Sequence, residues 1–229
     1  MNVAIIAAAG QGKRLGGKRA KQFLELAGTP IIIHTLKRFE QCASVDEIFV
    51  VLPAEDVAGF LTLAAKHGLG KLRRVVAGGA TRAESVWRGL QAVRAATAHI
   101  VAVHDGVRPF VTPEEISRTI EAAKECGAAI LTTPATDTIK EVEQGRVRRT
   151  LTRADLRHAL TPQCFRYALL RRAYEEAGAL SAELTDDSAL VERLGAPISI
   201  VEGDARNIKI TRPADIALAE IILREFEGK

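Results

Sequence analysis

Short apolar runs alternate with helical patterns along almost the whole of this chain, and that alternation limits its possible folds more than any other feature. The apolar runs are near-continuous, which is typical of strands buried on both faces of a sheet. Expected strands are Val3–Ala9, Glu47–Leu52, Arg74–Ala77, His99–His104, Ala128–Thr133 and Ile198–Glu202. Expected helices are Pro30–Gln41, Ala54–His67, Arg82–Ala95, Pro113–Cys126, Leu156–Ala177, Asp187–Leu194 and Pro213–Glu225. The alternation predicts an α/β fold with a mostly parallel sheet, covered by helices on both faces and built as one domain over residues 1–229.

The carboxyl ends of the expected strands are where a ligand should bind, because open parallel sheets take up their ligands at that edge. This rule directs attention to residues 10–21, 77–85 and 104–109. Two of the following helices have well-marked starts. Thr81-Arg-Ala-Glu84 and Thr112-Pro-Glu-Glu115 both match a capping box, the second with Pro at the first helical position.

The segment after the first strand is strongly basic. Met1–Leu24 contains no acidic residue, yet five cations lie between Lys13 and Lys21, after a Gly10-Gln-Gly12 turn. Glycine lets backbone N–H groups approach phosphate oxygens, and the cations neutralise them. The third glycine of a dinucleotide fingerprint would fall at Leu15, and no P-loop pattern occurs. The concentration of charge therefore suits a triphosphate.

A single carboxylate stands at the end of an expected central strand. Asp105 follows the apolar run Ile100–Val103, and one carboxylate together with substrate phosphates is a usual way to hold Mg²⁺. Arg108, three residues on, can bind a phosphate in a bidentate manner. We interpret His104 as a packed, hydrogen-bonded histidine and not as a catalyst.

Two further segments carry candidate binding groups. The double glycine of Ala77-Gly-Gly-Ala-Thr81 lets a flat ring approach the backbone, and Ser85 can hydrogen-bond a base. Lys209 lies between Ile208 and Ile210 in a run that resembles a buried strand. A lysine in such a place needs either a partner or a function.

Residues 138–153 depart from the strand–helix alternation. Two largely polar, β-capable arms flank Gln144-Gly145, a turn-forming pair, which predicts a β-hairpin. An isolated hairpin is marginally stable in water, so this arm should pack on something. A second copy of the chain is the simplest partner, and a solvated edge hairpin is the alternative.

Composition excludes several classes of protein. The apolar runs are too short for a membrane helix, and the amino terminus lacks the layout of a signal peptide, so we expect a cytoplasmic protein that does not enter membranes. The net charge of +4, with one Trp and two Tyr, does not indicate a nucleic-acid binder. The widely spaced Cys42, Cys126 and Cys164 indicate neither disulfides nor a zinc site.

Taken together, these motifs resemble those of one family. The ordered series is Ala7-Ala-Ala-Gly-x-Gly-x-Arg14, Lys21-Gln-Phe23, Gly78-Gly79, His104-Asp-x-x-Arg-Pro109, Asp137-Thr-Ile-Lys140, Ala159-Leu-Thr-Pro-Gln163, Thr185-Asp-Asp187 and Asn207-Ile-Lys-Ile-Thr211. Over about Val3 to Leu223 the chain is similar to the 2-C-methyl-D-erythritol 4-phosphate cytidylyltransferases of the non-mevalonate isoprenoid pathway. The resemblance implies a Rossmann-like sheet of the nucleotide-diphospho-sugar transferase type. It also implies transfer of CMP from CTP to methylerythritol phosphate, with release of pyrophosphate and with Mg²⁺ as cofactor.

The resemblance assigns roles residue by residue. It implies nucleoside binding by Ala8, Ala9, Gly10, Gly12, Gly79, Ala80 and Ser85. It implies catalytic cations at Arg14, Lys21 and Lys209, and Mg²⁺ at Asp105. It implies binding of the sugar phosphate, a polyol phosphate, by Arg108, Thr138, Arg153, Thr161 and Thr185 together with Lys209. The family's hairpin mediates a homodimer in which Thr138 and Arg153 reach the neighbour's site. Ala20 and Ala80 depart from the family, which usually has Pro at the first position and often a polar residue at the second.

Three other functions compete with this one. A ribitol-5-phosphate cytidylyltransferase of the same fold would share the nucleotide half, although Arg153, Thr161 and Lys209 favour methylerythritol phosphate. A non-catalytic CTP sensor would need neither Asp105 nor the cations on the acceptor side. A dinucleotide-dependent oxidoreductase is disfavoured by the broken fingerprint.

Overall fold

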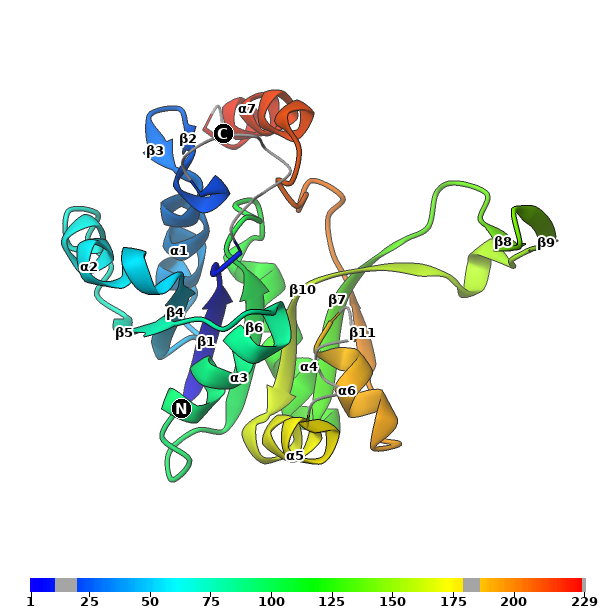
Figure 1. The fold of residues 1–229 in the computed structure, drawn as a ribbon, viewed down its shortest axis with the longest axis horizontal. Coiled ribbons are helices and arrows are strands. Elements are labelled where there is room, and N and C mark those ends of the chain that lie inside the picture. Colours follow the sequence, from blue (N-terminus) through cyan, green and yellow to red (C-terminus); the bar gives the residue numbers. More distant parts are fainter. Residues whose placement is uncertain (11–19, 179–185, 228–229) are drawn as a thin grey trace.

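The fold is that of a computed structural model, which describes residues 1–10, 20–178 and 186–227. Its centre is a seven-stranded sheet with the order β11-β7-β10-β6-β1-β4-β5 (Figure 1). The strands are β1 (Asn2–Ala7), β4 (Glu47–Leu52), β5 (Leu72–Ala77), β6 (Ile100–Asp105), β7 (Ala128–Pro134), β10 (Arg157–Arg166) and β11 (Ser199–Glu202). All neighbouring pairs are parallel except those of β10, which is antiparallel to both β6 and β7. The predicted mostly parallel sheet is confirmed.

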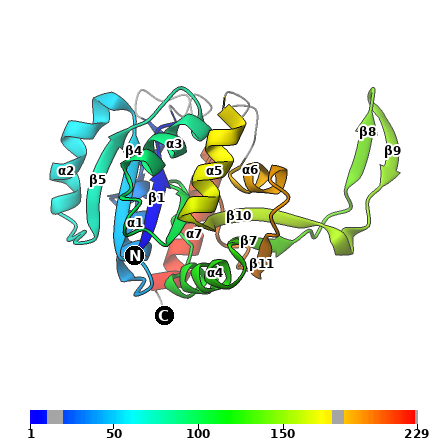
Figure 2. The same cartoon turned by 90° about the horizontal axis from the view of Figure 1, so that it is seen from below.

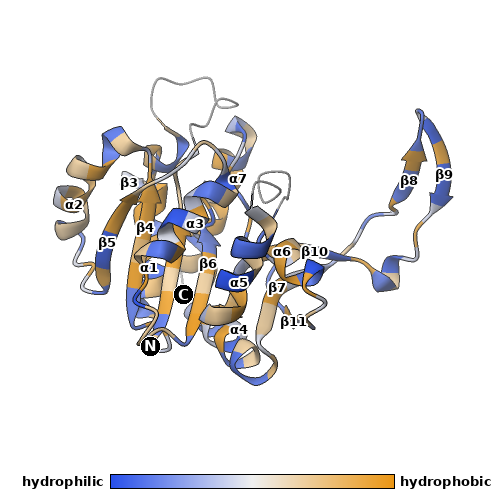
Figure 3. Ribbon diagram, turned by 60° about the horizontal axis from the view of Figure 1, so that its bottom comes forward, coloured by the Kyte–Doolittle hydropathy of each residue, from blue (hydrophilic) through white to orange (hydrophobic). Residues whose placement is uncertain are grey.

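Helices cover both faces of the sheet. The helices are α1 (Ile31–Gln41), α2 (Val57–Ala65), α3 (Arg82–Ala92), α4 (Pro113–Cys126), α5 (Tyr167–Ala177), α6 (Ser188–Arg193) and α7 (Pro213–Glu227). One core cluster joins α1, α2 and α4 to one face, and a second joins α3, α5 and α6 to the other. Side chains of β1 alternate between the two, since Ala4 and Ile6 belong to the first cluster and Val3 and Ile5 to the second. Burial on both faces explains why the central strands β1, β4 and β6 are mainly hydrophobic, as the mostly orange ribbons of β4 and β6 show in Figure 3.

The α4 start has the predicted capping box, and the α3 start has half of it. Thr112 accepts a hydrogen bond from the Glu115 backbone, and the Glu115 side chain accepts one from the Thr112 backbone. At α3, Thr81 accepts from the Glu84 backbone, but the Glu84 carboxylate binds the backbone N–H of Ala80 at 2.7 Å. Glu84 therefore holds the glycine loop in front of the helix.

The largest error of the sequence prediction concerns residues 156–177, for which the pattern predicts one helix. They form β10 followed by α5. β10 lies between β6 and β7, where Cys164 and Phe165 are buried on opposite faces. Pro162 lies at the point where the register with β7 shifts, a place that tolerates proline in a strand and that a helix interior would not provide.

Smaller differences concern the ends of the elements. A short β2 (Glu25–Leu26) pairs with β3 (Thr29–Pro30), which the sequence does not predict, and a 3₁₀ turn over Ala54–Asp56 precedes α2. The expected strand around Lys209 is wrong, because residues 207–210 belong to no strand. The Ile210 backbone instead donates to the Val107 carbonyl at 2.9 Å, which holds this segment beside the end of β6.

The predicted hairpin is confirmed as a separate two-stranded sheet of β8 (Lys140–Glu143) and β9 (Arg146–Thr150). Gln144 and Gly145 both have positive φ, of 49° and 76°, as a tight hairpin turn requires. The hairpin projects away from the sheet in both views (Figures 1 and 2). The single domain over residues 1–229 stays a prediction.

Two expectations from composition concern the helices and the cysteines. No helix in the described part of the chain is long and apolar enough to cross a membrane. All three cysteines carry free thiols; Cys42 and Cys164 are buried and Cys126 is half-buried.

Candidate active site

A cavity of about 630 Å³ opens at the carboxyl edge of the sheet. It lies where β1 and β6 end, and the start of α3 and the segment before α7 complete its wall. Of the site residues expected from the sequence, it is lined by Ala8, Ala9, Gly10, Lys21, Gly79, Ala80, Ser85, Asp105 and Lys209. The structure therefore brings together residues from both ends of the chain. Gly12, Arg14 and Thr185 lie outside the described residues.

The glycine loop before α3 packs tightly against the end of β1. A Cβ atom on Gly78 would lie 2.3 Å from the Cβ of Ala9, so this position accepts no side chain. Ser85, on the first turn of α3, accepts a hydrogen bond from the backbone N–H of Gly79 at 3.0 Å and donates to the Thr81 carbonyl at 2.8 Å. Its hydroxyl thus fixes the loop, and a contact of Ser85 with a base stays a prediction.

Asp105 is the centre of charge in the cavity. Three cations contact its carboxylate: Arg82 Nε at 3.1 Å, Lys209 Nζ at 2.9 Å and Arg108 Nε at 3.3 Å. Burial opposes ionisation of Asp105, but Arg82, Lys209 and Arg108 more than offset it and hold the pKa of its carboxyl well below the usual range. The carboxylate is therefore charged at neutral pH.

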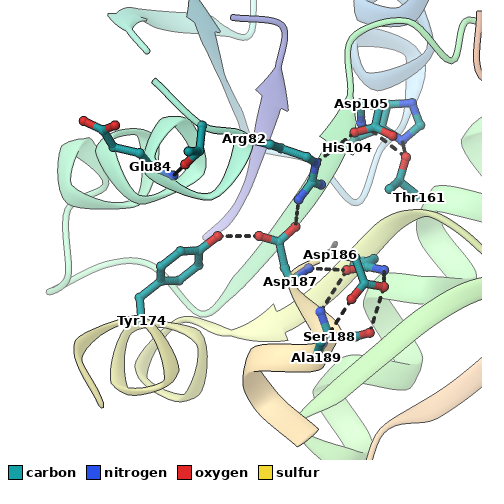
Figure 4. Close-up of polar contacts among 12 residues, drawn as sticks. Arg82, Glu84, His104, Asp105, Thr161, Tyr174, Asp186, Asp187, Ser188 and Ala189 are labelled. Carbon is teal, nitrogen blue, oxygen red and sulfur yellow. Dashed lines mark hydrogen bonds and ion pairs between the residues drawn. The ribbon is translucent and has the colours of Figure 1, made fainter. Parts of the chain in front are cut away.

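Arg82, at the start of α3, joins the cavity to α5 and α6 on the same face of the sheet, and the sequence alone does not predict its role. Its Nη1 contacts Asp187 Oδ2 at 2.7 Å, and the hydroxyl of Tyr174 donates to Asp187 Oδ1 at 2.5 Å (Figure 4). Burial lowers the pKa of Arg82, but Asp187 and Asp105 together raise it above its ordinary value. Since Arg82 and Asp187 are 105 positions apart, no local sequence signal pairs them.

The Thr161 hydroxyl holds the end of β6 from the neighbouring strand β10. It accepts a hydrogen bond from the Asp105 backbone at 3.2 Å and lies 2.9 Å from His104 Nδ1. His104 Nε2 lies 3.1 Å from the Arg108 carbonyl, so both ring nitrogens have partners. Its full burial and these two contacts confirm that His104 is packed and hydrogen-bonded, and burial lowers its pKa to about 4, which keeps the ring neutral at pH 7.

Gln163, two residues further along β10, fixes the start of α6. Its Oε1 accepts the backbone N–H groups of Asp187 and Ser188, and its Nε2 donates to Asp186 at 2.8 Å. Asp186 in turn accepts from Ser188 and from the Ala189 backbone (Figure 4). The motifs Thr161-Pro-Gln163 and Asp186-Asp187 are therefore two sides of one hydrogen-bonded junction.

Two expected substrate residues lie on the stem of the hairpin, away from the cavity. Thr138 precedes β8 and Arg153 follows β9, and Arg153 Nη1 donates to the Thr136 carbonyl at 3.0 Å. Neither residue lines the cavity of its own chain. A role for them in a site would require the cavity of another copy.

The residues of the cavity suit a magnesium ion only if phosphate oxygens of a bound nucleotide are among its ligands. No group of three or more His, Cys, Asp and Glu side chains forms a metal site within residues 1–10, 20–178 and 186–227. Asp105 is a single carboxylate beside a cavity large enough for phosphates, and Mg²⁺ commonly combines one carboxylate with phosphate oxygens and water. The residues present therefore fit a metal that arrives with a nucleotide.

The sheet topology and the cation-rich cavity at its carboxyl edge suit a protein that binds a nucleotide, and the family match defines the class as a nucleotidyltransferase. The family model of 2-C-methyl-D-erythritol 4-phosphate cytidylyltransferase matches residues 2–225. The chain belongs to this family and is an enzyme of the non-mevalonate isoprenoid pathway.

Relatives in sequence and in structure support the assignment. The chain is 46% identical over 225 residues to the cytidylyltransferase of that name from Geobacter metallireducens, with 97% of each chain covered. It is 44% identical over 227 residues to the one from Bacillus velezensis, covering 99% of this chain and 97% of the relative. The crystal structure of 4-diphosphocytidyl-2C-methyl-D-erythritol synthase from Anaerococcus prevotii superposes with a TM-score of 0.86 at 33% identity, covering 97% of this chain and 96% of that one.

Proposed function

We propose that this protein transfers CMP from CTP to 2-C-methyl-D-erythritol 4-phosphate, giving 4-diphosphocytidyl-2-C-methyl-D-erythritol and pyrophosphate. One observation carries the proposal beyond family membership: three cations converge on Asp105 at the edge of a cavity that also contains Lys21. Such an array can hold a triphosphate and a phosphate monoester side by side. A sensor that only bound CTP would have no use for the acceptor half of the array.

The reaction is an in-line displacement without a covalent intermediate. The nucleophile is a phosphate monoester, which is largely dianionic at neutral pH because its second pKa is about 6. No general base is required, and His104 is buried with both ring nitrogens engaged. An oxygen of the dianion attacks the α-phosphorus of CTP while the bond to the pyrophosphate oxygen breaks. The protein contributes proximity and stabilisation of the charge on the five-coordinate phosphorus.

The described residues divide this work among themselves. The backbone of Ala8, Ala9, Gly10, Gly79 and Ala80 receives the nucleoside, since these positions line the cavity without long side chains. Lys21 and Lys209 stabilise the phosphates, and Arg108 and Thr161 stand on the acceptor side of Asp105. Asp105 would hold Mg²⁺, which would supply positive charge to offset that of the phosphates. Arg14, Gly12 and Thr185, outside the described residues, keep the roles that the family resemblance gives them.

A second copy of the chain supplies Thr138 and Arg153. Val142 and Val147 face each other across the hairpin and are 59% and 63% exposed, which leaves an apolar pair for a partner to cover. A homodimer through these arms buries the pair and carries Arg153 to the neighbour's cavity.

Pyrophosphate release tests the reaction. Purified protein with CTP, Mg²⁺ and methylerythritol phosphate should release pyrophosphate, and ribitol 5-phosphate in its place should give little. Lys21→Ala should lower turnover by about 10²–10³, by analogy with the loss of one preorganised donor. Lys66→Ala, at an exposed position at the end of α2, is the matched control. Absence of release with methylerythritol phosphate overturns the reaction, and normal turnover of Lys21→Ala removes Lys21 from it.

A mixture of two inactive variants tests the arm. Lys21→Ala damages the cavity and Arg153→Ala the arm, so each variant alone should be nearly inactive. When the two are mixed and allowed to exchange subunits, half of the dimers are mixed, and each contains one intact site. About a quarter of wild-type activity should return, since a symmetric dimer has two equivalent sites. Failure to recover activity in dimers shown to have exchanged would mean that Arg153 does not act across the interface.

A further inference from the structure

Both oxygens of the Asp105 carboxylate already have cationic partners. Arg82 contacts Oδ1, while Lys209 and Arg108 contact Oδ2 at 2.9 and 3.3 Å. The carboxylate is only 7% exposed. A divalent ion that binds Oδ2, where Lys209 and Arg108 already occupy both lone-pair positions, must therefore replace one of these two cations.

The three cations are not held equally. Arg82 has a second ion pair with Asp187 at 2.7 Å, and Arg108 Nη1 donates to the Asn207 carbonyl at 2.8 Å. Among the described residues, the ammonium of Lys209 contacts Asp105. The Lys209 side chain is 37% exposed, against 28% for Arg82 and 11% for Arg108. Lys209 is therefore the cation that can leave with least loss.

The geometry also lets the Lys209 ammonium leave without moving the chain. The neighbouring Ile210 is fully buried and its backbone donates to the Val107 carbonyl, which anchors the segment. The lysine side chain adds four rotatable methylene groups beyond this anchor and lines the cavity. A phosphate group in the cavity offers the ammonium a new anionic partner within the reach of that side chain.

Electrostatic repulsion disfavours a divalent ion on Oδ2 while the Lys209 ammonium contacts that oxygen. Two like charges about 4 Å apart repel strongly at the effective dielectric of about 20 that describes partly buried sites. A divalent ion on Oδ2 would lie beside the Lys209 ammonium, which is 2.9 Å from that oxygen, and beside the Arg108 guanidinium, so its binding is opposed as long as no phosphate is present. Phosphates change the balance, because they attract both the ion and the ammonium.

We propose that Lys209 occupies the metal position on Asp105 until the nucleotide arrives, and that the two cations then exchange. The ammonium moves from Oδ2 to phosphate oxygens, and the divalent ion takes its place on the carboxylate. No covalent bond changes in this step. Lys209 thereby makes metal binding at Asp105 depend on the nucleotide. The inference rests on the proposed function, since it takes Asp105 as the metal ligand.

Binding of Mn²⁺ to the protein without nucleotide tests the exchange. The electron paramagnetic resonance signal of free Mn²⁺ gives the affinity of the wild type, Lys209→Gln, Lys209→Arg and the control Lys71→Gln. Lys71 donates to the Cys42 carbonyl at 2.6 Å and does not line the cavity. Its Gln variant loses the same single positive charge as Lys209→Gln, which makes it a matched control. We expect Lys209→Gln to bind Mn²⁺ tighter than the wild type, on the order of tenfold or more. Lys209→Arg and Lys71→Gln should remain close to the wild type.

Two further measurements connect this result to the site. Asp105→Asn in the Lys209→Gln background should abolish the gain, because the gained ion sits on that carboxylate. With α,β-methylene CTP, which cannot transfer CMP, the advantage of Lys209→Gln should disappear. Equal Mn²⁺ affinity of the wild type and Lys209→Gln without nucleotide, or binding too weak to measure in both, overturns the exchange. Retention of the gain in the Asp105→Asn background also overturns it. Failure of the proposed function is a separate result, since it appears as absent pyrophosphate release in the wild type.

Discussion

The Arg82–Asp187 ion pair should contribute to stability as a coupled unit, which a double-mutant cycle can measure. The variants are Arg82→Gln, Asp187→Asn and the double variant, each of which keeps the approximate shape of the side chain. Asp187 is 1% exposed and Arg82 is 28% exposed, so water screens their 2.7 Å contact only in part. Two unit charges about 4 Å apart attract by about 4 kcal/mol at an effective dielectric of about 20.

The measured coupling should be smaller than this gross attraction. Desolvation of both groups opposes it, and Arg82 keeps its 3.1 Å contact with Asp105 when Asp187 is changed. We therefore expect a coupling free energy of about 2 kcal/mol, within the range found for residues that share a buried network. Asp187→Asn alone should lower the free energy of unfolding by about 3 kcal/mol, because it removes the coupling to Arg82 and also weakens the hydrogen bond from Tyr174.

Urea unfolding of the four proteins, followed by circular dichroism, gives the cycle. Arg172 and Glu176 form the control pair, since they approach to 2.6 Å on α5 but are 65% and 53% exposed. Their cycle should give about 0.3–0.5 kcal/mol, as exposed pairs one helical turn apart do. A coupling for Arg82 and Asp187 no larger than that of the control pair would refute the argument that the buried network acts as a unit.

Three further predictions follow from separate parts of the structure. Gly78→Ala should lower the free energy of unfolding by more than about 1 kcal/mol and weaken CTP binding measured by calorimetry, because its Cβ would overlap that of Ala9. As pH falls from about 6.5 to 4, the difference in the free energy of unfolding between the wild type and His104→Gln should shrink by about 1 kcal/mol per pH unit in urea titrations. The reason is that burial lowers the pKa of His104 to about 4, so that in this pH range only the unfolded chain takes up the proton. The charged and polar groups that face the ring are Asp105, Arg108 and Thr161. A difference in the free energy of unfolding that stays the same across this pH range would contradict the linkage. Val142→Glu combined with Val147→Glu should give a folded monomer in sedimentation experiments, and a persistent dimer would exclude the arm as the interface.

Much of the fold could be predicted because it depends on local patterns. The strands β1, β4, β6 and β7 and the helix α4 are close to the ranges expected from hydrophobic runs and caps. Their carboxyl ends converge because the strands are parallel, so the strand pattern alone is enough to predict that Asp105 lies near the Ala8–Gly10 segment. The hairpin turn followed from Gln144-Gly145 for the same local reason.

The strand β10 shows where local patterns fail. Its sequence has apolar residues at spacings that also suit a helix, and only its position between β6 and β7 makes an extended chain favourable. The error also hides contacts of the site. In β10, Thr161 accepts a hydrogen bond from the end of β6 and Gln163 accepts one from the start of α6, and a helix at residues 156–177 does not predict either contact. Pro162 was the local signal against a helix.

The sequence by itself determined the class of fold, the edge of the sheet that holds the site, and the kinds of side chain that serve phosphates and a metal. Hydrophobic periodicity, turns and caps act over a few residues, so they can be recognised without the rest of the chain. Only the tertiary structure decided which charges meet. Arg82 bridges Asp105 and Asp187, and Lys209 reaches Asp105 from a segment that is not a strand. Ion pairs depend on distance in space and on burial, and both arise only when β1, β6, β10 and α3 pack together.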